Sequence, residues 1–257
     1  MLPVETVHLV AGTAEAWLAP TRGGMVTRLR LGGEDVLYLD EPTLADPTKN
    51  VRGGVPILFP IGGKPDDRAL KQHGFARNFP WRAIQTQPTA VLELEAPSET
   101  RAAYPYDFRL IYTYTLGETS LRIDQRFENR GEAPMPIRPG LHPYFAVADK
   151  ATARVETDAT VAWDNVAGAR VPFRGLDLTA GEIDMHLLDH HPAGTRLSRP
   201  PARDVVLSWS ADQRVLVVWT LPGKPFVCVE PWLAPASTPS TLVPPGGAHE
   251  SWLSISI

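Results

Sequence analysis

The 257-residue chain is 43 % hydrophobic, has a formal net charge of −4 and contains a single cysteine, Cys228. It therefore shows no sign of the basic face that nucleic-acid binding requires, and it cannot form an internal disulfide. The longest apolar stretch, residues 55–61, contains two prolines and is too short to span a bilayer. The first residues lack the features of a signal peptide. We expect a cytoplasmic protein with no membrane or nucleic-acid partner; the sequence leaves its oligomeric state open.

Period-two alternation of apolar and polar residues recurs along the chain from the first predicted strand to the last. Because 26 prolines interrupt the sequence, long helices are disfavoured. Short strands with turns between them are typical of an antiparallel sandwich or barrel. The predicted strands are Met25–Leu31, Ala90–Glu95, Phe108–Leu116, Ser120–Asn129, Asp204–Trp209, Arg214–Leu221, Phe226–Glu230 and Ser251–Ile257. We expect one all-β domain over residues 1–257, in which residues 149–203 form long loops and short strands.

The predicted strand that ends at Glu230 carries a carboxylate in an apolar setting. Phe226, Cys228 and Glu230 share one face, and the valines between them share the other. Cysteine is among the residues most often buried, so both faces look covered, and we expect Pro231 to end the strand's pairing. A buried carboxylate is costly unless it is paired or functional. Glu230 is therefore a candidate catalytic residue, with a salt-bridged structural glutamate as the alternative.

Four further residues stand out beside apolar, aromatic or glycine-rich sequence. His142 lies in GLHPYF, and His73 lies in QHGFAR, in a turn flanked by glycine. Arg52 precedes two glycines, and Arg77 follows the HGF sequence. Each also has a structural reading: a core histidine, a solvated loop histidine, or arginines that pair with carboxylates such as Asp66, Asp67 or Glu230.

Several other chemistries find no support in the sequence. It contains no Gly-x-Ser-x-Gly motif, no phosphate-binding P-loop and no pair of cysteines for a zinc site. His186, Asp189, His190 and His191 are close in sequence, but we interpret these histidines as solvated loop residues. We expect no metal and no cofactor.

The motifs RGGVPILFP, HGFARN, LHPYF and VCVEPW occur in this order along the chain. Together they resemble the galactose-mutarotase-like superfamily, and within it the glucose-6-phosphate 1-epimerase and aldose 1-epimerase branch. The resemblance implies a large antiparallel β-supersandwich with a sugar site in its concave face. It also implies an isomerase that interconverts the α and β anomers of an aldose. The motifs favour a hexose 6-phosphate as that aldose.

The resemblance assigns roles to six residues of this sequence. It places the catalytic pair on His142 and Glu230, and sugar binding on His73. Arg52 and Arg77 correspond to ligands of the phosphate in the phosphosugar branch. Asp184, in GEIDMHL, matches a further site aspartate, although the three residues after it depart from the family pattern. Trp232 also departs from the best-known phosphosugar enzymes, which weakens the phosphate assignment.

Mutarotation opens and re-closes the sugar ring, so one group must take a proton and another must give one. We expect ionised Glu230 as the base and protonated His142 as the acid, with the roles exchanged on closure. Both must reach one sugar ring, so we expect the two groups to lie roughly 5–8 Å apart. Phe75, Trp81, Tyr144 and Trp232 are candidates for a stacking wall, or for the core.

Three other functions remain open. The first is an aldose 1-epimerase that acts on unphosphorylated sugar, which depends on where Arg52 and Arg77 lie. The second is a non-catalytic sugar-binding module, which the presence of both an acid and a base disfavours. The third is a glycosidase or lyase on a similar sandwich. A glycosidase requires two facing carboxylates, and the motifs supply only one.

Overall fold

The computed structural model describes residues 4–65, 69–234 and 238–257. Within these ranges the chain is almost entirely β-structure, and its one α-helix, α1 (Glu41–Ala45), is five residues long. Single turns of 3₁₀ helix occupy Pro20–Arg22, Ala76–Asn78 and Ser98–Thr100. None of the described helices is long and apolar enough to cross a membrane. The all-β expectation is confirmed.

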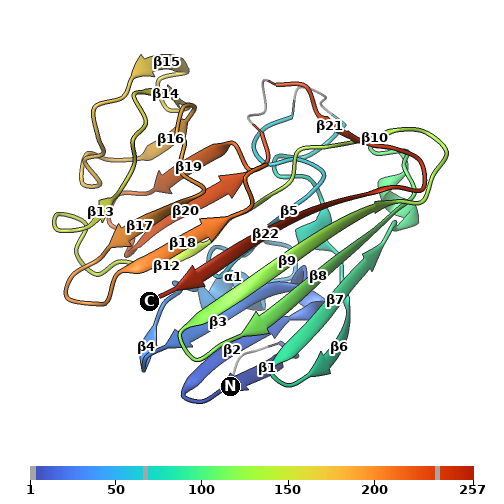
Figure 1. The fold of residues 1–257 in the computed structure, drawn as a ribbon, viewed down its shortest axis with the longest axis horizontal. Coiled ribbons are helices and arrows are strands. Elements are labelled where there is room, and N and C mark those ends of the chain that lie inside the picture. The colour runs from blue at the N-terminus through green and yellow to red at the C-terminus, as the bar shows by residue number, and fades with distance from the viewer. Residues whose placement is uncertain (1–3, 66–68, 235–237) are drawn as a thin grey trace.

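One large antiparallel sheet has eight strands (Figure 1). Seven follow the order β15-β14-β16-β19-β20-β11-β5, and β12 also pairs with β20. Their bounds, in that order and with β12 last, are Ala169–Pro172, Val161–Asp164, Ile183–Leu187, Val215–Thr220, Phe226–Trp232, Gly140–Leu141, Ile57–Leu58 and Tyr144–Ala146. This sheet brings chain segments far apart in sequence, β5, β11 and β20, side by side.

The second large antiparallel sheet also has eight strands, in the order β13-β17-β18-β22-β9-β8-β7-β6. Their bounds, in that order, are Arg154–Val155, Gly194–Ser198, Val205–Trp209, Ala248–Ser256, Ser120–Asn129, Phe108–Leu116, Thr89–Glu95 and Arg82–Thr86. Strand β9 pairs with β8 on one side and β22 on the other along its full length, which makes it the central strand of this sheet.

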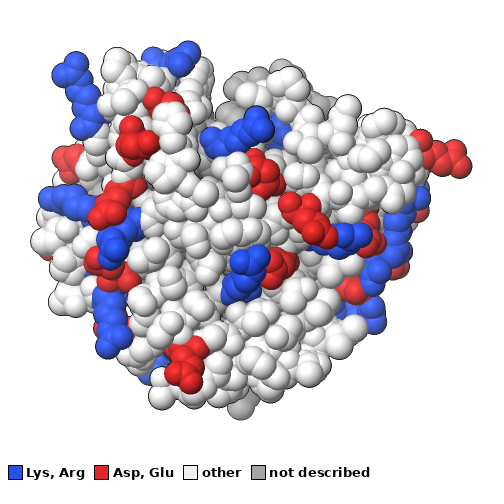
Figure 2. All heavy atoms as spheres, in the orientation of Figure 1, with Lys and Arg blue, Asp and Glu red and all other residues white. Residues whose placement is uncertain are grey.

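Two smaller sheets complete the architecture. Strands β1-β2-β3-β4 form a four-stranded sheet that contacts β7 and β8, and β10 pairs with β21. Their bounds are Val7–Ala11, Ala14–Ala19, Met25–Leu31, Glu34–Asp35, Met135–Ile137 and Thr241–Val243. On the face shown in Figure 2, acidic and basic side chains are interspersed.

The core forms where the inward faces of the sheets meet. Along β8 the expected face is fully buried: Phe108, Leu110, Tyr112, Tyr114 and Leu116 are each at most 1 % exposed. They belong to one apolar cluster with side chains from all three larger sheets. Removing so much apolar surface from water is the main stabilising contribution, at about 25 cal/mol per Å². The predicted alternation therefore identified the core face correctly.

Strand β20 has one face in this core and its other face on the opposite side of the sheet. Val227 and Val229 point into the main core, whereas Cys228 and Glu230 point to the other face. The expected end of pairing at Pro231 is wrong, because Pro231 pairs with Leu216 and β20 continues through Trp232. A proline lacks only its own N–H, so its carbonyl and its neighbours can still pair. The longer strand keeps Trp232 on the same face as Glu230.

Candidate active site

A cavity of about 780 Å³ opens on the face of the first large sheet that carries Glu230. Its walls come from strands β16, β19 and β20 and from the segments around residues 40–52, 63–64, 72–77 and 142–144. All six residues that the sequence singled out line this cavity: Arg52, His73, Arg77, His142, Asp184 and Glu230. Residues up to 178 positions apart thus meet at one place.

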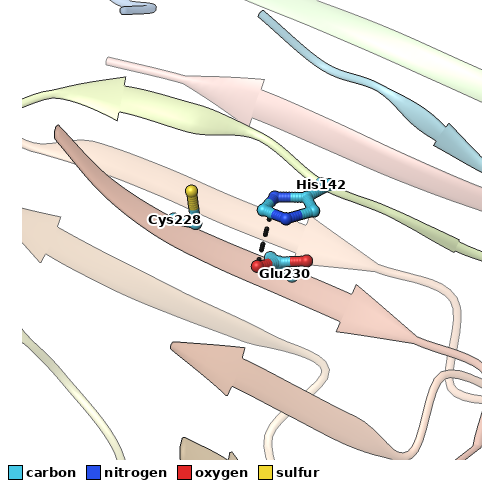
Figure 3. A group of neighbouring side chains, drawn as sticks. All are labelled: His142, Cys228 and Glu230. Carbon is cyan, nitrogen blue, oxygen red and sulfur yellow. Dashed lines mark ion pairs between the residues drawn. The ribbon is translucent and has the colours of Figure 1, made fainter. Parts of the chain in front are cut away.

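Backbone pairing places His142 opposite Glu230. Gly140 pairs with Trp232 and Tyr144 pairs with Cys228, so the antiparallel register brings residue 142 to residue 230. His142 Nδ1 lies 3.2 Å from Glu230 Oε1 (Figure 3). This is closer than the 5–8 Å we expected. Directly opposed residues have Cβ atoms only about 4.5–5.5 Å apart, so their side-chain tips meet.

Glu230 is almost completely buried, with 1 % of its side chain exposed. Burial raises its pKa well above the ordinary value, and the nearby charge of Asp184 raises it further. A hydrogen bond from Trp232 Nε1 to Glu230 Oε2, at 3.2 Å, and the charge of Arg77 act in the opposite direction. The carboxyl therefore holds a proton far more readily than a glutamate in water.

His142 is buried beside Glu230 and stacks on Tyr144, with ring centroids 4.6 Å apart and an angle of 9° between the planes. Burial lowers its pKa well below the ordinary value, and the neighbouring His73 and Arg77 lower it further. The geometry thus favours a protonated carboxyl beside a neutral imidazole. We expected ionised Glu230 and protonated His142, and low solvation reverses that preference. The two states differ by one proton transfer within the pair.

His73 lies beside the pair in a strained backbone conformation, with φ of 65°. Its Nδ1 accepts a hydrogen bond from the N–H of Gly63 at 3.0 Å, so the neutral ring carries its proton on Nε2. Burial lowers its pKa to about 3, and the charge of Arg77 adds to this effect. The sequence suggested a solvated loop histidine as the alternative, yet only 9 % of His73 is exposed. It is a fixed, neutral hydrogen-bond donor.

Gly74 makes this turn possible. A Cβ atom at this position would lie 2.0 Å from the carbonyl oxygen of Phe59, and the residue has φ of +67°. The amide N–H of Phe75 donates to that same carbonyl. The HGF sequence therefore brings the chain against the segment before Pro60, where His73 faces the cavity.

Arg77 is half-buried, and one of its terminal nitrogens, Nη2, donates to the carbonyl of Gln72 at 2.9 Å. Its buried Nε has no hydrogen-bond partner among the described residues. Arg52 is exposed at the cavity edge. Neither arginine forms an ion pair with a described carboxylate, Glu230 included; Asp66 and Asp67 lie outside the described residues. Two guanidinium groups thus line one cavity without an ion pair to any carboxylate of the described residues.

The floor of the cavity continues across the sheet from Glu230. Val217 pairs with both Glu230 and His186, and Trp219 pairs with both Cys228 and Asp184. Burial alone would raise the pKa of Asp184, but hydrogen bonds from His186 and Asn165 hold it below its ordinary value. Asp184 is therefore an ionised residue of the cavity, despite its departure from the family pattern.

The histidines of the 186–191 segment separate in space. His186 faces the cavity, whereas His190 and His191 contact Asp158 at 3.3 and 3.1 Å. Asp189 instead accepts hydrogen bonds from residues 160 and 161. The interpretation of all three histidines as solvated is wrong for His186 and His190, whose side chains are 9 % and 3 % exposed.

The aromatic candidates divide into two groups. Phe75 and Trp81 pack in or against the main core, whereas Tyr144 and Trp232 line the cavity. The sequence reasoning missed Trp219, Asn165 and Glu182 as cavity residues. Their positions follow from the pairing of β16 with β14 and β19 and from the turn after β14, none of which is readable from local alternation.

The comparisons with known proteins agree with this architecture. Residues 5–256 match the family model described as Aldose 1-epimerase, so the chain belongs to the aldose 1-epimerase family. A protein from Escherichia coli (strain K12) named "Putative glucose-6-phosphate 1-epimerase" is 37 % identical over 224 residues, which cover 77 % of this chain and 73 % of that one. A Salmonella typhimurium protein of the same name is 35 % identical over 130 residues; the match covers 49 % of this chain and 42 % of the relative's length.

Solved structures show the same fold. The Slr1438 protein from Synechocystis sp. PCC 6803 superimposes with a TM-score of 0.93 at 33 % identity, covering 98 % of this chain and 95 % of that one. A galactose mutarotase related enzyme from Lactobacillus acidophilus has a TM-score of 0.80 at 17 % identity, with 98 % and 97 % covered. The galactose-mutarotase-like fold implied by the sequence motifs is confirmed.

Proposed function

We propose that this chain is a mutarotase that interconverts the α and β anomers of a hexose 6-phosphate, with Glu230 and His142 as its acid–base pair. The observation that carries the proposal is the buried Glu230–His142 pair, 3.2 Å apart, on the floor of a cavity of about 780 Å³. The family match over residues 5–256 supports the isomerase chemistry. It also supports treating this range as one catalytic domain.

Ring opening removes a proton from the anomeric hydroxyl and delivers one to the ring oxygen. A pair that shares one proton supplies both functions: the unprotonated member accepts while the protonated member donates. After opening, the proton has changed its place within the pair, and closure on the other face of the carbonyl reverses the transfer. No electron is transferred and no covalent intermediate forms, so we assign no cofactor.

Burial suits the pair to this exchange. In water the proton prefers imidazole over carboxylate by about 2 pKa units. Burial raises the pKa of Glu230 and lowers that of His142, which shifts the proton towards Glu230. The protonated carboxyl can then donate while the neutral imidazole accepts, and the proton alternates between them in each half-reaction.

The remaining cavity residues bind the substrate in this proposal. His73 presents its Nε2–H to a sugar hydroxyl, and Asp184 accepts from another. Tyr144, Trp219 and Trp232 supply apolar ring faces against which the pyranose can pack. A non-catalytic binding module would have no use for a buried acid–base pair. Because burying such a pair is costly, its presence favours a catalytic role.

Arg52 and Arg77 bind the 6-phosphate in this proposal. A protein with a net charge of −4 repels a dianionic sugar unless local cations offset that field. Both arginines line the cavity without a carboxylate partner among the described residues, and both of their charges act on Tyr144. A guanidinium group matches the geometry of phosphate oxygens. Lys49 and Lys64 add positive charge to the same cavity; Arg68, on the same loop, lies outside the described residues.

The test compares kcat/KM for glucose 6-phosphate and glucose in wild type, Arg77→Ala and Arg52→Ala. Arg174→Ala is the matched control, because Arg174 is exposed and does not line the cavity. Wild type and the control should prefer the phosphosugar. Arg77→Ala should lose roughly 2–4 kcal/mol of that preference, the scale for a lost charge-assisted contact. Equal activity on both sugars in wild type would instead indicate an aldose 1-epimerase for unphosphorylated sugar.

A further inference from the structure

Cys228 lies beside the acid–base pair. Its side chain points to the same face of β20 as Glu230, two residues further on (Figure 3). One ligand-type atom each of His142, Cys228 and Glu230 lies within 4.8 Å of the other two. All three side chains are buried, and Cys228 is 0 % exposed. The sequence alternation predicts that Cys228 and Glu230 share one face, and the pairing of β11 and β12 with β20 adds His142 to them.

His142 Nδ1 is the second observation that points to a ligand. It is buried, yet it has no hydrogen-bond partner among the described residues. Although Glu230 Oε1 lies only 3.2 Å away, this contact does not have the geometry of a hydrogen bond. A buried nitrogen without a partner is costly. This nitrogen and this oxygen lie close together without a hydrogen bond between them, so both can coordinate a cation placed between them.

We propose that His142 Nδ1, Cys228 Sγ and a carboxylate oxygen of Glu230 form a binding site for a thiophilic divalent cation such as Zn²⁺, and that occupation of this site inhibits the enzyme. Cysteine, histidine and glutamate are all established types of zinc ligand. Three protein ligands leave a fourth position, which the cavity beside His142 and Glu230 can supply with water.

The distances fit tetrahedral coordination after a small adjustment. Zinc bonds of about 2.0–2.3 Å place neighbouring ligand atoms roughly 3.3–3.6 Å apart. The His142–Glu230 distance of 3.2 Å already meets this requirement. Because no two ligand-type atoms of the cluster are more than 4.8 Å apart, each separation that involves the sulfur has to shorten by at most about 1.3 Å. A change in the Cys228 rotamer and small shifts of the other two side chains are sufficient.

Charge balance favours a divalent cation at this buried position. When the cation binds, Cys228 releases its thiol proton and the single proton shared by Glu230 and His142 also leaves to solvent. The ligands are then one thiolate, one carboxylate and one neutral imidazole, whose charge of −2 cancels that of the cation. The cost of creating a buried thiolate is offset by the metal–sulfur bond.

Inhibition follows from the residues involved. A bound cation occupies the lone pair of His142 and the carboxylate of Glu230, so neither can accept or donate a proton. This part of the inference rests on the proposed function, whereas binding itself does not. A binding measurement that needs no turnover therefore separates the two.

Cobalt(II) provides that measurement, because Cys228 is the only cysteine in the chain. Wild type should bind one equivalent of Co²⁺ and develop a near-ultraviolet thiolate-to-cobalt charge-transfer band, which Zn²⁺ then abolishes. Cys228→Ser should lack the band. His142→Asn and Glu230→Gln keep the thiol and should bind Co²⁺ roughly tenfold more weakly or worse. His191→Ala, which removes an exposed histidine elsewhere, should behave as wild type.

The outcomes are distinct. Absence of the band in folded wild type, or an undiminished band in both His142→Asn and Glu230→Gln, would overturn the site. Near-ultraviolet circular dichroism checks that each variant is folded. With the site established, Zn²⁺ should slow anomer exchange in wild type, and EDTA should restore it. With each rate expressed relative to the same protein's metal-free rate, Cys228→Ser should need at least about tenfold more Zn²⁺ than wild type for the same fractional inhibition. Equal sensitivity would contradict inhibition through this site, and failure of exchange in metal-free wild type would instead contradict the proposed function.

Discussion

Trp232 Nε1 donates a hydrogen bond of 3.2 Å to Oε2 of Glu230, while Oε1 of the same carboxyl faces His142 Nδ1 at 3.2 Å. The two oxygens thus have different neighbours, one a fixed donor and the other a titratable ring. Because Trp232 and Glu230 are two residues apart on β20, they lie on one face of the strand. The tryptophan favours the ionised carboxylate, and burial favours the protonated carboxyl.

The first prediction concerns the pH dependence of this pair in metal-free buffer containing EDTA. The active pair holds one proton, so kcat/KM should follow a bell-shaped curve. With the proton on Glu230, Trp232→Phe removes a bond that lowers the carboxyl pKa, so the alkaline limb should move to higher pH. Loss of one hydrogen bond to a charged group, about 1.5–3 kcal/mol, corresponds to about 1–2 pH units. An unmoved alkaline limb would contradict the placement of the proton on Glu230.

The second prediction concerns His73 and stability in acid. Its pKa is about 3 in the folded protein, against 6.5 for an unperturbed histidine. Between these values the unfolded chain binds more protons than the folded protein, so stability falls as the pH falls from 6.5 towards 3. His73→Asn should reduce this fall by up to about 1.4 kcal/mol per pH unit, measured by urea unfolding between pH 6 and pH 4.

The same substitution should also affect substrate binding. Because we assign His73 to positioning, His73→Asn should raise KM more than it lowers kcat. In wild type, the ring signals of His73 in an NMR titration should not move between pH 5 and pH 8. A titration near pH 6.5 would show that the ring is solvated and would remove the argument for a neutral donor.

The third prediction compares two glycines with the same backbone conformation. Gly74 and Gly223 both have φ of +67°, but a Cβ at Gly74 would lie 2.0 Å from the Phe59 oxygen, whereas nothing lies within 4 Å of one at Gly223. Gly223→Ala should cost about 1–2 kcal/mol for the left-handed conformation alone. Gly74→Ala should cost a further 1–3 kcal/mol or so for the clash. Chemical denaturation of both variants measures the difference, and equal costs would contradict the close approach at Gly74.

Strands that bury one face were predicted accurately from the sequence, and β8 and β9 match their expected bounds. There the alternation is long and each side chain has only two faces to choose from. The prediction was wrong at Pro231. This residue has no N–H to donate, yet β20 still pairs with β19 there and at Trp232. Local propensity describes one strand, whereas pairing depends on its neighbours.

The site was predictable only where motifs carry it. His142, Glu230, His73 and both arginines were found through four short sequences, and they line one cavity. Trp219 and Asn165 were missed because their position follows from the pairing of β16 with β19 and from the turn after β14. The His142–Glu230 distance was overestimated because cross-strand register, unlike motif spacing, cannot be read from one chain segment.

The most direct test of the central claim is magnetisation transfer between the α and β anomeric protons of glucose 6-phosphate at equilibrium. Measured in metal-free buffer, wild type should accelerate the exchange well above the rate without protein. Glu230→Gln keeps the side-chain shape but can neither donate nor accept the proton, so its rate should fall by a factor on the order of 10² or more while the sugar still binds. Exchange at the protein-free rate in wild type, or at the wild-type rate in Glu230→Gln, would contradict the account.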